Sequence, residues 1–358
     1  MNRIAAQGAG QIIGLIDGQQ VVGLDIAKSV FQLHTVDMST GEIVNVQLKR
    51  AKVVEHFAKR APSLIGIEAC GGAHHWAREL TQLGHNVRLI HAKAVRPFVA
   101  GNKTDAADAR AIWLAVQQPG TKFVGMETLA QQATLVLHRQ RELLMRMKVM
   151  QINALRGLLY EFGATFARGR NALFSEIEAA LESLVNDIPQ YVADSLREQV
   201  QRIKQLAADI KATEVRLAQR LRGDEDMKRI AAIPGVGLLT ATAAIATMGE
   251  ATAFKSAREF CAWLGLVPKQ RGTGGRVNLL GISKRGDTYL RTLLIHGARA
   301  VLSHAKQPGA WLEQIKARRP PNVVIVAQAA KMARTIWAVT ARQQDYQRGH
   351  HSARPQAV

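Results

Sequence analysis

Two short apolar runs near the start of the chain each end on a single carboxylate, and this pattern constrains the fold most. Val21-Val22-Gly23-Leu24 is followed by Asp25, and Leu64-Ile65-Gly66-Ile67 is followed by Glu68. Short apolar runs of this kind are typical of buried strands. A carboxylate beside a buried core is costly unless something positive lies next to it. The pattern therefore predicts a sheet whose strand ends hold a cation.

A second pair of carboxylates, Asp105 and Asp108, follows Thr104, which is a good N-cap for a helix. Residues three apart lie on one helix face, so these two side chains can point at one spot. Four carboxylates from two strands and a helix would hold Mg²⁺, or Mn²⁺ in its place, through oxygen ligands. Taken singly, Asp25 could cap the chain as it leaves a strand, and the helix pair could complement the helix dipole. Taken together on so basic a chain, we favour the metal site.

Residues 20–118 alternate between strand and helix patterns. Apolar runs and period-two alternation predict strands at 21–25, 30–36, 43–48, 64–68 and 87–90. Helices are expected at 51–59 and 73–83, and from residues 92 and 104. Three strands followed by alternating helix and strand predict an α/β domain with a sheet of mixed direction.

The middle of the chain has a different pattern, with few aromatic residues and apolar residues at helical spacing. Long helices are expected at 127–159, 171–184 and 194–221. Such lengths favour paired helices, including a coiled coil. An ordinary helical bundle fits the pattern equally well.

The last part of the chain opens with Ile233-Pro234-Gly235-Val236-Gly237, before a predicted helix at 238–248. Gly235 and Gly237 could let the backbone approach a phosphate at a helix N-terminus. A plain turn between helices could use the same glycines.

The stretch Gly265–Asp287 is rich in glycine, hydroxyl groups and cations, and we expect an exposed loop lying on a phosphate backbone. Its cations are Lys269, Arg271, Arg276, Lys284 and Arg285. A solvated loop with no partner is the alternative. Helices at 290–304 and 323–340 and a disordered tail at 343–358 follow. The predicted domains are therefore 1–120, 121–225 and 226–342, before that tail.

Charge is concentrated toward the end of the chain. The net charge is +20, with 48 Lys and Arg against 28 Asp and Glu, and residues 226–358 hold 20 of these cations against 6 of the acids. This asymmetry favours a polyanionic partner. We find neither an uninterrupted apolar span long enough for a bilayer nor a signal peptide, so we expect no membrane partner. Cys70 and Cys261 lack metal-ligand spacing, which favours a reducing, cytoplasmic location beside the nucleoid.

Several stretches together resemble one known family. They are Gly23–Lys28, Gly66–Ala69, Asn102–Arg110, Ile233–Gly237, Gly265–Pro268 and Gly281–Gly286. From about residue 20 to about residue 340 the chain resembles bacterial insertion-sequence transposases with an RuvC-like Asp-Glu-Asp-Asp domain, guided by a bridge (seeker) RNA.

The resemblance implies an RuvC-like (RNase H-like) α/β domain, a helical coiled-coil insert and a mainly α C-terminal transposase domain. It implies that Asp25, Glu68, Asp105 and Asp108 hold Mg²⁺. It also implies a serine nucleophile in a glycine-rich loop, and the matching position here is Thr273. A threonine hydroxyl can attack phosphorus, although its β-branch makes the side chain stiffer.

Ser283 is the alternative nucleophile. Lys28 and Lys103 could contact nucleic acid beside the metals, and the cations of Gly265–Asp287 could hold DNA or RNA backbone. The partners implied are donor and target DNA, a structured guide RNA, and further copies of this chain in a dimer or tetramer, because the two halves of the site meet across protomers.

Two other functions remain open. A protein-only RuvC-like junction resolvase would use the carboxylates with water and leave hydrolysed ends. A nucleic-acid-binding protein with an inactive nuclease fold would not need Asp105. The full set of carboxylates speaks against the second function, and the basic C-terminal part speaks against the first.

Overall fold

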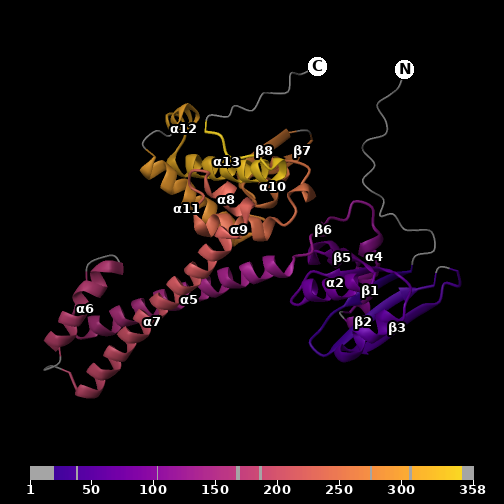
Figure 1. The fold of residues 1–358 in the computed structure, drawn as a ribbon, viewed down its shortest axis with the longest axis horizontal. Helices are drawn as coiled ribbons and strands as arrows, with labels where there is room; N and C mark the ends of the chain where they lie inside the picture. The colour runs from indigo at the N-terminus through magenta and orange to yellow at the C-terminus, as the bar shows by residue number, and fades with distance from the viewer. Residues whose placement is uncertain are drawn as a thin grey trace. The chain divides into compact units, whose positions relative to one another are not determined.

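The computed structural model describes residues 20–37, 39–102, 104–166, 170–184, 188–274, 276–305 and 309–348 (Figure 1). The chain divides into two compact units, 1–127 and 128–358. Of the tail predicted to be disordered, residues 349–358 lie outside the described residues.

The N-terminal unit is built on a six-stranded sheet with the order β3-β2-β1-β4-β5-β6. The strands are β1 (Val21–Asp25), β2 (Val30–Val36), β3 (Ile43–Lys49), β4 (Leu64–Glu68), β5 (Asn86–Ile90) and β6 (Phe123–Val124). The first three strands form an antiparallel meander, β4 and β5 run parallel to β1, and β6 is antiparallel to β5. This mixed sheet is the predicted RNase H-like arrangement. The two residues of β6 are too few to show a sequence pattern, and the sequence analysis missed this strand.

Helices cover both faces of the sheet. On one face, α1 (Val53–Ala58) and α2 (Ala73–Gln82) bury Phe57 and Trp76 against Phe31 and Leu33 of β2. On the other face lie α3 (Ala92–Val95) and α4 (Asp105–Gln117). The sheet is therefore buried on both sides, which explains why β1 and β4 are continuous apolar runs.

Two glycines let α4 lie directly on the sheet. A Cβ at Gly23 would collide with the backbone of Ala109 and Trp113, and one at Gly66 would lie 2.9 Å from Cβ of Val116. The Trp113 indole N–H also donates to the carbonyl of Val21, at 3.2 Å. Residues 113 and 109 of the helix thus lie beside residues 21 and 23 of the strand. It follows that α4 runs antiparallel to β1 and begins near the carboxyl end of that strand.

Two long helices of the C-terminal unit, α5 (Leu129–Glu161) and α7 (Gln190–Arg222), pack against each other, as predicted. Thr128 and Gln131 form a capping box at the start of α5, which satisfies backbone N–H groups of the first turn. Where α5 ends and α7 begins, α6 (Arg170–Leu184) joins a common apolar cluster that includes Leu155, Ile177 and Leu196.

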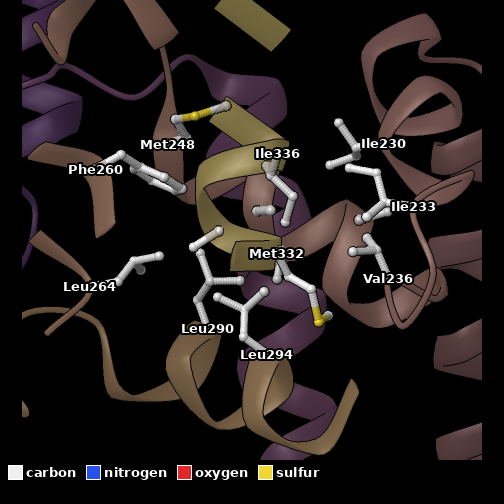
Figure 2. Packing of buried hydrophobic residues seen from close by; sticks show 14 of the residues in the cluster. Ile230, Ile233, Val236, Met248, Phe260, Leu264, Leu290, Leu294, Met332 and Ile336 are labelled. Carbon is white, nitrogen blue, oxygen red and sulfur yellow. The ribbon is translucent and has the colours of Figure 1, made fainter. Parts of the chain in front are cut away.

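The rest of this unit packs around one core (Figure 2). Its helices are α8 (Glu225–Ala231), α9 (Leu238–Met248), α10 (Ala257–Trp263), α11 (Thr288–His304), α12 (Ala310–Lys316) and α13 (Pro321–Arg342). The seven-residue helices α8, α10 and α12 are too short to show a 3.6-residue period, and the sequence analysis missed them. Because α5 and α7 also pack on α9, compactness alone gives two units. The three-domain division stays a prediction.

One helix of the described residues passes a looser test for a membrane span than the uninterrupted apolar run that the sequence analysis sought. By length and composition alone, the 22-residue helix α13 is long and apolar enough. Lys331 and Arg334 interrupt its apolar run, which is why a search for an uninterrupted span missed it. In the structure α13 contributes Met332, Ala333 and Ile336 to the core of this unit, so it serves as a core helix. Figure 2 shows Met332 and Ile336 in this core.

Candidate catalytic carboxylates and nucleic-acid face

The sheet brings Asp25 and Glu68 side by side. β1 and β4 are parallel neighbours with Gly23 opposite Gly66 and Leu24 opposite Ile67, so Asp25 and Glu68 end the two strands at the same level. Both carboxylates are half-buried. Side chains alternate between the faces of a sheet, so both lie on the face of Gly23 and Gly66, which α4 covers.

The pKa of Cys70, which lies two residues after β4, reflects desolvation and the negative charge at this edge of the sheet. Desolvation, followed by the negative charges of Glu68 and Asp25, raises the pKa of the Cys70 thiol. Both carboxylates therefore act on one sulfur atom. A cation held beside these two like charges would offset the repulsion between them.

The first turn of α4 carries the other two carboxylates. The Thr104 hydroxyl accepts a hydrogen bond from the backbone N–H of Ala107 at 3.2 Å, which confirms the predicted N-cap. Asp105 is exposed and Asp108 is half-buried. Because α4 runs antiparallel to β1, this turn is directed toward the strand ends that carry Asp25 and Glu68.

Carboxylate oxygens are suitable ligands for a hard divalent cation such as Mg²⁺. The structure does not bring all four of the predicted carboxylates together. Over the described part of the chain, no group of three or more His, Cys, Asp or Glu side chains is placed to hold a metal ion. Asp25 and Glu68 end neighbouring strands at the same level, and the set of four carboxylates stays a prediction. Lys28 is exposed in the turn between β1 and β2, and Lys103 lies outside the described residues.

The stretch predicted to be an exposed loop is instead a β-hairpin. β7 (Pro268–Thr273) and β8 (Arg276–Ile282) are antiparallel, and both strands are exposed apart from half-buried Ile282. The sequence analysis missed these strands because the stretch is rich in glycine and cations, which are typical of loops. The signal that could have found them is the alternation of Val277 and Leu279 with polar residues in β8.

Thr273 is the last residue of β7 and lies exposed beside the turn of the hairpin. It is directly opposite Arg276 in the ladder, so the hydroxyl and the guanidinium lie on one face. Gly274 follows with φ of 57°, a left-handed conformation that glycine adopts without strain.

Ser283, the alternative nucleophile, does not cap the next helix. The cap of α11 is Asp287, whose carboxylate accepts from the backbone N–H of Leu290 at 2.5 Å. Ser283 is half-buried, and its backbone N–H donates to the carbonyl of Val267 at 2.8 Å. The carboxylate is a better acceptor than a hydroxyl and is closer in sequence to the helix.

Lys284 and Arg285 lie on a loop that is stabilised by Arg291, a residue the sequence analysis missed. The buried guanidinium of Arg291 donates to the carbonyl of Arg285 at 2.8 Å and to that of Leu264 at 2.9 Å. A Cβ at Gly286 would collide with the carbonyl of Trp263, so the loop lies directly on the end of α10. Lys284 itself has φ of 54°. The two cations are thus presented on a fixed loop with a strained backbone.

Comparison with known proteins places the chain in a family. Residues 22–163 match a family described as transposase, of the DEDD type of IS110 elements, and residues 227–312 match the transposase IS116/IS110/IS902 family. A probable family 20 transposase of Pseudomonas aeruginosa is 44% identical over 333 residues, which cover 92% of this chain and 98% of that protein. The chain belongs to the IS116/IS110/IS902 family of transposases.

Other members of the family are nearly as similar. The transposase for insertion sequence element IS1111A of Coxiella burnetii is 38% identical, with 92% of each chain covered. The transposase for IS1328 of Yersinia enterocolitica is 36% identical over 89% of this chain and 96% of its own. The protein is therefore a transposase, a DNA-processing enzyme, with the carboxylate-bearing region and the hairpin each inside a matched segment.

In this transposase the turn before α9 has a packing role. Gly235 has φ of 86°, and a Cβ there would lie 2.8 Å from the carbonyl of Gly297 in α11. The glycine is thus required for the close approach of turn and helix. Gly237 is exposed at the start of α9, where a Cβ would meet nothing. Phosphate binding by either glycine stays a prediction.

Proposed function

We propose that this transposase cuts and rejoins DNA through the Thr273 hydroxyl, at a divalent-metal site of Asp25, Glu68, Asp105 and Asp108. The observation that carries the metal site is the placement of Asp25 and Glu68 at one level on one face of the sheet. The helix over that face begins with the other two carboxylates near the same strand ends. When bound there, Mg²⁺ supplies charge neutralisation at the scissile phosphate.

The chain's own residues would carry the covalent step. The Thr273 oxygen would form a bond to phosphorus, and the leaving nucleotide oxygen would depart and take up a proton. Attack by a hydroxyl of another DNA strand would break the protein–phosphate bond and return the proton to Thr273. Arg276, opposite Thr273, and Arg271, two residues before it, would stabilise charge on the phosphate oxygens.

We further propose that a structured RNA guides the choice of donor and target DNA. The support is the resemblance set out above together with the basic C-terminal part of the chain. Affinity for that RNA should fall steeply with salt because phosphate contacts release counterions. Unchanged site-specific recombination after RNase treatment would refute the guide and leave a protein-only mechanism.

Asp25→Ala and Asp105→Ala test the metal site. Each variant should lose strand exchange in Mg²⁺ but keep its fold and RNA binding, because each removes oxygen ligands rather than core contacts. Glu42→Gln is the control, since Glu42 is an exposed acid in the same unit, in the segment between β2 and β3. Full strand exchange by either alanine variant would remove the metal-site proposal.

Substitutions at the two hydroxyls test the nucleophile. Thr273→Ala should stop covalent attachment to DNA, whereas Thr273→Ser should retain or raise it, because serine lacks the stiffening β-branch. Ser283→Ala should affect stability or binding more than chemistry. Mass spectrometry of protein trapped on a stalled DNA substrate locates the adduct. An adduct on Ser283 would show that Thr273 is not the nucleophile, and hydrolysed ends without an adduct would favour the resolvase mechanism.

A further inference from the structure

The β7–β8 hairpin separates its side chains into two unlike faces. Residues directly opposite each other in an antiparallel ladder share a face, and each strand alternates between faces. Arg271 opposes Asn278 and Thr273 opposes Arg276, whereas Gly272 opposes Val277 and Gln270 opposes Leu279. The first face therefore holds Arg271, Thr273, Arg276 and Asn278. The second holds Gln270, Gly272, Val277 and Leu279, and the register of the ladder shifts between Pro268 and Gln270.

The polar face is suited to a polyanion. It carries two cations, Arg271 and Arg276, and the sequence from 268 to 286 contains no Asp or Glu to balance them. Every residue of this face is exposed. Like charges gathered on two adjacent strands repel, and this cost is offset when phosphates lie between them.

The shape of the hairpin selects the form of nucleic acid. The major groove of B-form DNA admits a two-stranded β-ribbon, whereas the deep, narrow major groove of an RNA helix does not admit side chains. A ribbon in the groove has phosphates along its borders and base edges in front of it.

Asn278 is the residue of this face suited to a base. It lies opposite Arg271 and two residues beyond Arg276. Its amide offers one acceptor and a donor group, the combination that pairs with N6 and N7 of adenine, whereas cations serve phosphates equally well. We propose that the polar face of the hairpin enters the major groove of duplex DNA and that Asn278 contacts a base edge there. This inference rests on the proposed action on DNA and adds sequence reading by the protein itself.

Selection from a randomised duplex pool tests the inference with the full chain, freed of bound nucleic acid by RNase and high salt, in buffer without Mg²⁺. Wild-type protein should enrich adenine at one position of the bound duplexes. Asn278→Ala should lose that preference, with discrimination at that position falling roughly 5- to 150-fold. Gln270→Ala is the matched control, because it removes an exposed amide from the opposite face of the same hairpin. It should enrich the same base as wild type.

Arg271→Ala distinguishes phosphate contacts, which position the DNA, from the base contact proposed for Asn278. It should weaken binding to all duplexes alike and lower the slope of affinity against salt by about one phosphate contact. The inference is overturned if wild type enriches no base, if Asn278→Ala keeps the wild-type preference, or if Gln270→Ala is the variant that loses it. Because no strand is cut in this experiment, failure of the proposed Thr273 chemistry would leave its result unchanged.

Discussion

At the scale of single residues, Lys284 combines a strained backbone with an exposed cation that we propose contacts a phosphate. Its φ of 54° lies in the left-handed region, which residues with a Cβ rarely adopt. Its backbone N–H donates to the carbonyl of Gly265 at 3.1 Å, so the loop holds this conformation. Strain of this kind commonly accompanies a functional position.

Lys284→Gly should therefore leave the protein as stable or up to about 1 kcal/mol more stable, because glycine adopts this conformation without a steric cost. The same change should weaken DNA binding and reduce its salt dependence, since one phosphate contact is lost. Thermal unfolding and DNA titrations across a salt series measure the two effects. Lys284→Ala is the control, as it removes the charge but keeps the strain. Equal stability of the Gly and Ala variants would contradict the role of strain.

At the scale of elements, the contact between β1 and α4 decides whether the carboxylates can meet. Gly23→Ala should destabilise the N-terminal unit by about 1–3 kcal/mol and move α4, because the new methyl would meet backbone atoms that cannot rotate away. Denaturant unfolding of the variant measures the loss. Gly125→Ala is the matched control in the same unit, because a Cβ there meets no neighbour and its φ is not positive. Equal stability of the two variants would show that the helix does not depend on this approach.

A buried histidine of one helix in the C-terminal unit forms hydrogen bonds with side chains of two other helices. His138 of α5 is 1% exposed, with Nδ1 at 2.9 Å from the Tyr289 hydroxyl of α11 and Nε2 at 3.0 Å from the Thr242 hydroxyl of α9. Burial, and to a smaller degree the charge of Arg141, lowers the pKa of His138 to about 4. The folded protein therefore holds this imidazole neutral.

The free energy of unfolding should fall as pH is lowered from about 6.5 toward 4. The unfolded chain takes up a proton near its ordinary pKa of 6.5, whereas the folded chain resists it until about 4. The loss from this group is up to about 3 kcal/mol and is absent above the unfolded pKa. Denaturant titrations at several pH values measure it. Because glutamine does not titrate, the free energy of unfolding of His138→Gln should depend less on pH. The pKa of His56 is also lowered, and the difference between the two proteins separates the effect of His138 from that of His56. Identical slopes would exclude His138 as the cause.

At the scale of the whole molecule, the proposed chemistry is divided between the two compact units. The carboxylates belong to residues 1–127 and Thr273 to residues 128–358. If the halves combine across protomers, a mixture of Asp105→Ala and Thr273→Ala should recover part of the strand exchange that neither variant shows alone. Mixed Asp25→Ala and Asp105→Ala should stay inactive, because no protomer then has an intact carboxylate set. An inactive first mixture would instead indicate that each chain completes its own site.

Local sequence determined many of the elements. β1, β2, β4 and α9 have the predicted bounds, because each is a compact apolar segment bounded by residues that end it. Thr104 caps α4 as expected, since an N-cap acts on the next three residues alone. The sequence also predicted the long helices α5 and α7 and the basic C-terminal part, because periodicity and charge are properties of the chain itself.

Only the tertiary structure decided which of these residues meet. The parallel register of β1 and β4 brings Asp25 and Glu68, more than forty residues apart in the chain, to the same level of the sheet. The approach of α4 to Gly23 directs the first turn of this helix to the same edge. The hairpin β7–β8 and the support of its neighbouring loop by Arg291 were equally hidden. Periodicity shows which way a side chain points within its own element. Register, pairing and close packing depend on partners far away in the sequence, and they are settled only when the whole core forms.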